Sequence, residues 1–180
     1  MGIWDLLKSK PEPATTGDTD TVRRIVSELE AMEPERARYL AAFAFTLARV
    51  AHADLSISRD ETSRMEEIVR KLGHLPAEQA VVAVHIAKAQ HLLSGGTESF
   101  LVTRELREIA TKEQCRELLD CLFAVAAADD SISGTEEHSI RQIASELGLT
   151  ARELADVRSS WHDKREILKG FARPVKTPSA

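Results

Sequence analysis

The sequence has few aromatic residues, few glycines and prolines, and only two cysteines. Five Phe, two Trp and one Tyr leave Ala, Leu, Ile and Val to build the core. The eight Gly and six Pro stand mostly between apolar runs, which favours helices joined by short connections. Cys115 and Cys121 lie in a segment predicted to be helical, where their spacing is too wide for a disulfide. We therefore expect reduced thiols and a cytoplasmic protein.

Long apolar runs and an excess of basic residues are also missing. The sequence has no run of about 18 apolar residues, so it predicts no membrane span. We expect no secretory signal, and Leu6 stands where a myristoylation signal has Ser or Thr. The formal net charge of −5 disfavours nucleic acid as a partner. No phosphate loop, nucleophile elbow or His pair at metal-binding spacing occurs, so we do not expect an enzyme.

Apolar residues recur at the helical period along most of the chain. Leu40, Phe43 and Leu47, for example, are spaced at i, i+3 and i+7. The pattern predicts an all-α, compact bundle of seven to eight helices. They run over about 21–31, from 34 onward, from 59 to 72, and over 76–93, 97–110, 111–128, 134–147 and 150–161. We expect flexible tails over 1–20 and, with basic character, over 163–180, on either side of one helical domain at 21–162.

Two details of this pattern carry further expectations. Residues 81–84 form a local candidate for a strand, but the neighbouring residues favour a helix there. The helix over 97–110 has Phe100, Leu101, Leu106 and Ile109 as its apolar positions.

A nine-residue segment occurs twice, 75 positions apart. Val50-Ala-His-Ala-Asp-Leu-Ser-Ile-Ser58 matches Val125-Ala-Ala-Ala-Asp-Asp-Ser-Ile-Ser133. The match continues without a gap, and 11 of the 24 positions from 50 to 73 are identical to their counterparts. The sequence therefore contains one helix–loop–helix unit twice, over about 35–73 and 112–148. Two copies predict a closed bundle with pseudo-two-fold symmetry, since an open solenoid needs more.

Both copies of the loop read A-D-x-S-I-S-x-x-E. Ser58 with Glu61, and Ser133 with Glu136, fit the capping box, in which the hydroxyl and the carboxylate each accept a backbone N–H of the other residue. The Ile before each cap is expected to plug the core between the two helices. Capping explains the Ser and the Glu without any function.

The aspartates of the loops are not explained by capping. Asp54 and Asp129 lie at the end of the incoming helix, where the helix dipole disfavours an anion. Their carboxylates either accept loop amides or supply oxygen ligands to a divalent cation. The loop lacks the EF-hand pattern, and two facing loops would pool their carboxylates into one acidic surface. The candidate ligands are Asp54, Asp129, Asp130, Glu61, Glu136 and Glu137.

The second copy resembles the TerB family of tellurite-resistance proteins. Val125 to Ile140 carries an Ala-rich helix and then A-D-x-x-I-S-x-x-E-x-x-x-I, and Val50 to Met65 follows this pattern more loosely. The resemblance covers roughly residues 35–160. It implies an all-helical fold, an association with tellurium-oxyanion resistance and stress, and a metal-sensing or scaffolding role beside membrane-linked partners. Leu55 and Asp130 depart from the family, which commonly has Gly after the loop Asp.

The sequence thus predicts a cytoplasmic, non-catalytic binding module whose acidic loops bind a divalent cation or a protein partner. A carboxylate–metal enzyme and a purely structural interaction domain are the alternatives. The partner can be membrane-associated, which would place the protein at the inner face of the membrane, and a homo-oligomer is a further option. Ile3, Trp4, Leu6 and Leu7 form an apolar patch that either contacts a partner or a membrane, or docks on the protein's own core.

Overall fold

Helices account for all the regular structure in the part of the chain that the computed structural model describes, which is residues 16–51, 59–93, 99–127 and 132–159. The helices are α2 (Thr16–Glu30), α3 (Pro34–Ala51), α4 (Arg59–Leu72), α5 (Ala77–Leu93), α6 (Ser99–Ile109), α7 (Lys112–Ala126), α8 (Gly134–Glu146) and a last helix over residues 151–159. These residues contain no strand. The predicted all-α bundle is confirmed, and residues 81–84 belong to α5.

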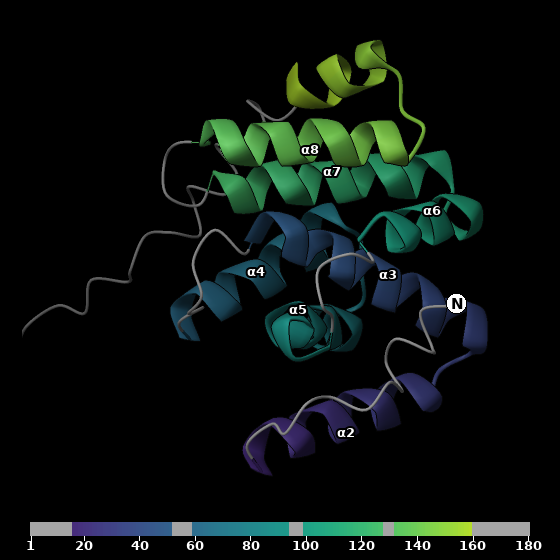
Figure 1. Cartoon of the computed structure of the whole chain (residues 1–180), viewed down its shortest axis with the longest axis vertical. Coiled ribbons are helices and arrows are strands. Elements are labelled where there is room, and N and C mark those ends of the chain that lie inside the picture. The colour runs from purple at the N-terminus through teal and green to yellow at the C-terminus, as the bar shows by residue number, and fades with distance from the viewer. Residues whose placement is uncertain (1–15, 52–58, 94–98, 128–131, 160–180) are drawn as a thin grey trace, which may run out of the picture.

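Helix α3 lies at the centre of the bundle. It contacts α2, α5, α6, α7 and α8, and Figure 1 shows it crossing the middle of the molecule between α2 on one side and α7 and α8 on the other. Ala37, Ala41, Ala44 and Ala48 are fully buried at helical spacing. These small side chains let the neighbouring helices pack close to the α3 backbone, which suits a core that is poor in aromatic residues.

Helices α7 and α8 both begin at capping boxes, and the box at α8 is the one that the repeated loop predicted. Thr111 Oγ1 accepts the Gln114 N–H at 3.2 Å, and Gln114 Oε1 accepts the Thr111 N–H at 2.8 Å. Ser133 and Glu136 form the same pair of bonds at 3.2 and 2.7 Å. Each N-cap contributes about 1 kcal/mol to the stability of the folded protein. In the other loop, Ser58 lies outside the described residues.

Helices α2 and α6 differ from the predictions. Helix α2 begins at Thr16, five residues before the predicted start. In α6, Phe100 and Leu101 are 56% and 48% exposed, whereas Val102 and Thr103 are buried. Leu106 is buried and Ile109 packs against the core, so two of the four predicted apolar positions face inward and the other two do not. In so short a helix, the apolar spacing does not by itself decide which face is buried.

Two smaller expectations concern α7 and the membrane. Cys115 and Cys121 are both buried in α7, and neither forms a disulfide. Across the described residues, no helix combines the length and the apolar character that a membrane crossing needs.

Candidate functional site

The structure describes three of the six carboxylates that were proposed as cation ligands. Glu61 is exposed on α4, while Glu136 and Glu137 are half-buried in the first turn of α8. The remaining three lie outside the described residues: Asp54, Asp129 and Asp130.

Glu136 and Glu137 both take part in contacts within the bundle. The capping bond to the Ser133 N–H uses Oε2 of Glu136. Oε1 of Glu137 lies 3.2 Å from Nη2 of Arg141 and 3.1 Å from Nη1 of Arg158. Within the described ranges, no three His, Cys, Asp or Glu side chains come together as a metal site would require. A cation site would therefore depend on the loop aspartates, and it stays a prediction.

The helices that flank the two acidic loops pack together. Helix α4 contacts α7, and α8 contacts both α3 and α7. In Figure 1, the ends of α3 and α7 and the starts of α4 and α8 all lie on the left side of the molecule. The helix ends that border the two loops in the sequence thus lie on the same side of the bundle.

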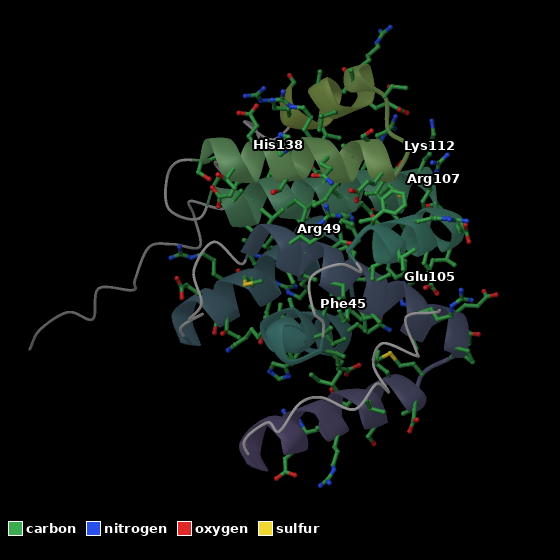
Figure 2. The ribbon with its side chains drawn as sticks, viewed as in Figure 1. Phe45, Arg49, Glu105, Arg107, Lys112 and His138 are labelled. Carbon is green, nitrogen blue, oxygen red and sulfur yellow. The ribbon has the colours of Figure 1, made fainter. Side chains whose placement is uncertain are left out.

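A buried ion pair joins α3 to α8 in the interior. Nη1 of Arg49 lies 2.6 Å from Oε2 of Glu146, and Nη2 lies 3.3 Å from Oε1. Their side chains are only 14% and 8% exposed. Thr103 of α6 donates its hydroxyl to the Glu146 carboxylate at 2.6 Å, and the Gln142 amide donates at 2.9 Å. Figure 2 shows Arg49 near the middle of the bundle. One carboxylate therefore connects three helices.

The environment of Glu146 keeps its carboxylate ionised. Burial by itself raises the pKa of Glu146, but hydrogen bonds from Arg49 and Thr103 and the Arg49 charge outweigh burial and hold the pKa below its ordinary value. A general acid or base at neutral pH needs a pKa near 7. The arrangement therefore suits a structural role. Sequence reasoning missed this pair, although Arg49 is the only Lys, Arg, Asp or Glu between Arg38 and Asp54.

A groove of about 390 Å³ runs between α8 and the helix over 151–159. The capping box of Thr150 and Glu153 starts this last helix, with bonds of 3.2 and 2.9 Å. Most of the surface that lines the groove is apolar, and its charged lining residues are Glu137, Arg141 and Arg158. The apolar lining includes Phe123, Ile140, Ala144, Leu149 and Leu154.

Together the described residues define an all-helical bundle centred on one alanine-rich helix and held by a buried charged network. A sequence model of the family described as tellurite resistance protein TerB matches residues 39–159, about two thirds of the chain. The chain belongs to this family, as the resemblance in the loops indicated. Comparison with curated proteins and with solved structures gives no match.

Proposed function

We propose that this chain is a non-catalytic binding module associated with tellurite resistance and stress, and that its acidic loops bind a divalent cation. The observation that carries the proposal is a shared spacing. Helices α3 and α4 stand on either side of the first loop in the sequence, as α7 and α8 stand on either side of the second. The loop aspartates Asp54 and Asp129 are 75 residues apart, which is the spacing of the repeated sequence. The agreement supports a duplicated helix–loop–helix unit with an Asp in each loop.

The position of these aspartates favours a ligand. Asp54 and Asp129 follow helix ends, where the dipole costs an anion about 0.3–1 kcal/mol unless a positive partner offsets it. Carboxylate oxygens are the ligands that Ca²⁺ and Mg²⁺ prefer. The flanking helix ends lie on one side of the bundle, which supports carboxylates shared between the two loops. Glu136 and Glu137 are engaged in a cap and in ion pairs, so the three aspartates carry the proposal and binding should be weak.

Calorimetric titration with Ca²⁺, Mg²⁺, Mn²⁺ and Zn²⁺ tests the proposal. We expect one of the ions to give binding heat with the wild type and little or none with Asp129→Asn/Asp130→Asn. The matched control is Glu108→Gln/Glu113→Gln, which removes the same formal charge at exposed positions on α6 and α7. The control should bind like the wild type. Absence of heat from the wild type, or equal heat from the loop variant, would contradict cation binding.

The same variants distinguish the remaining interpretations. A protein that co-purifies with the wild type and the control, but not with the loop variant, would indicate that the loops bind a protein partner. If the loop variant changes only the free energy of unfolding and retains every partner, the loops are capped turns and the module is purely structural.

A further inference from the structure

The groove between α8 and the helix over 151–159 combines an apolar lining with an excess of positive charge. Phe123, Ile140 and Leu154 supply apolar surface, and the rim carries Arg141 and Arg158. Its volume of about 390 Å³ lies within the range of pockets that enclose a ligand, roughly 300–1,000 Å³. An apolar segment that carries a carboxylate would therefore match its chemistry.

The two arginines share a single carboxylate. Arg141 Nη2 and Arg158 Nη1 both approach Oε1 of Glu137, at 3.2 and 3.1 Å. Among the described residues, neither arginine has an ion pair with any other carboxylate. The cluster therefore carries two positive charges and one negative charge. A second carboxylate placed beside the arginines would balance this charge through charge-assisted hydrogen bonds.

The N-terminal sequence provides this combination. Ile3-Trp4-Asp5-Leu6-Leu7 places one carboxylate within an apolar run. The N-terminal residues 1–15 have two Lys and Arg against two Asp and Glu, whereas the C-terminal sequence after Ser159, which also contains apolar residues, has five against two. The net charge of the C-terminal sequence has the same sign as that of the arginine pair. Charge complementarity therefore favours the N-terminal segment as the occupant.

The fold places the start of α2 and the groove at opposite ends of one molecule. Figure 1 shows α2 at the bottom of the longest axis and the helix over 151–159 at the top. Leu7 lies nine positions before Thr16, the first residue of α2, and this length of chain spans at most about 30 Å. A compact body of about 140 residues is nearly 40 Å across on average, and longer along its longest axis. The segment therefore reaches the groove of another copy more readily than its own.

We propose that Ile3–Leu7 of one copy docks in the groove of a second copy, with Trp4 and Leu7 against the apolar lining and Asp5 beside Arg141 and Arg158. The contact joins two different surfaces, so it is head-to-tail and repeats along a ring or a filament. Because the docked segment is so small, the association is weak, with a dissociation constant expected between roughly 10 µM and 1 mM. The contact does not depend on the cation proposed for the loops.

Sedimentation velocity of the full chain over this concentration range tests the proposal. We expect the average mass of the wild type to rise with concentration. Trp4→Ala, Asp5→Arg and Arg158→Glu should each raise the concentration needed for association by about tenfold or more. The charge-exchanged variant Asp5→Arg/Arg158→Glu should recover most of the wild-type association. Arg152→Glu reverses a charge on the same helix outside the groove, so it should behave like the wild type.

Each contrary result overturns the proposal. A wild type that stays monomeric at 1 mM shows that the groove is covered by something else, whether the C-terminal segment or another protein. Association that Trp4→Ala leaves unchanged places the contact on another surface. A charge-exchanged variant that associates less than both single variants rejects the pairing of Asp5 with the arginines. Circular dichroism and the unfolding midpoint of Arg158→Glu establish that it folds, and the Asp5→Arg result stands without it.

Discussion

Gly73 and Gly148 occupy matching positions in the two sequence copies, but different constraints act on them. Gly148 has φ of +78°, a conformation that glycine adopts without steric cost. It ends α8 in a Schellman motif, in which Leu149 N–H donates to the Ala144 carbonyl at 2.9 Å and Gly148 N–H to Ser145 at 3.0 Å. After α4, the positive φ of +48° falls on His74 instead.

Gly73 is required by packing and not by its backbone angle. A Cβ atom there would lie 2.6 Å from the Val69 carbonyl oxygen, 3.1 Å from Cζ of Phe43 and 3.2 Å from Sγ of Cys121. The end of α4 therefore fits against α3 and α7 only without a side chain. Glycine therefore stands at both matching positions, but for a different physical reason at each.

Gly73→Ala should lower the free energy of unfolding by about 1–3 kcal/mol, because the added methyl group overpacks a rigid junction. Urea unfolding at neutral pH measures this change. Gly134→Ala is the matched control, since nothing lies within 4 Å of a Cβ at that first residue of α8. The control should be neutral or stabilising by up to about 1 kcal/mol. Equal midpoints for the two variants would show that the α4 junction relaxes around the methyl group.

At the scale of helices, the Arg49–Glu146 pair fixes α8 against α3, and Thr103 adds α6 to the same contact. Removing one member leaves the other charge buried without its partner. Arg49→Met should therefore cost about 3–5 kcal/mol of unfolding free energy. Arg49→Met/Glu146→Leu replaces the whole pair by apolar side chains of similar size, so it should recover most of this loss.

The exposed pair of Arg104 and Glu108 provides the comparison for this experiment. Both side chains are 66% exposed, and their charged atoms are 3.6 Å apart. A double-mutant cycle on this pair should give a coupling of no more than about 0.5 kcal/mol. If the cycle on Arg49 and Glu146 gives a coupling as small as this, the buried pair does not hold the three helices together.

Whether each of these features could be predicted depends on how far apart in the sequence the interacting residues lie. The starts of α7 and α8 could be predicted because a capping box links residues three positions apart, as in Thr111 with Gln114. The partner of Arg49 could not be predicted, since Glu146 is 97 residues away. The exposure of Phe100 and Leu101 is also set by distant contacts, because α3 and α8 decide which face of α6 is buried.

At the scale of the whole molecule, one candidate site could be predicted from the sequence and the other could not. The acidic loops could be found in the sequence because the repeat aligns Asp54 with Asp129. The groove could not, because it forms only when the helix over 151–159 lies against α8 and brings Arg158 to Glu137. Family membership rests on the same local patterns as the loops, so sequence reaches the fold and the family but not the surfaces made between helices.

Acid should destabilise the whole bundle through carboxylates whose pKa is lower in the folded state. The Thr150 backbone N–H, followed by a hydrogen bond from Lys112, lowers the pKa of Glu153 to about 2, and the pKa of Glu146 is also lowered. An ordinary Glu titrates near pH 4.3, so between about pH 4.3 and 2 the unfolded chain binds more protons than the folded chain. The stabilisation is therefore fully present above about pH 4.3 and is lost as the pH falls toward 2.

Urea unfolding at a series of pH values measures this loss, and an NMR titration of the Glu153 carboxyl reports its pKa directly. Lys112 Nζ lies 3.0 Å from Glu153 Oε1, so Lys112→Ala removes both a hydrogen-bond donor and a positive charge. The variant should raise the pKa of Glu153 and start its protonation at a higher pH. Glu153→Gln cannot titrate, so its unfolding free energy should fall less steeply below about pH 4.3 than that of the wild type. A wild type that becomes more stable between pH 4.3 and 2 would reverse the predicted sign, because the folded state would then be the one that binds more protons.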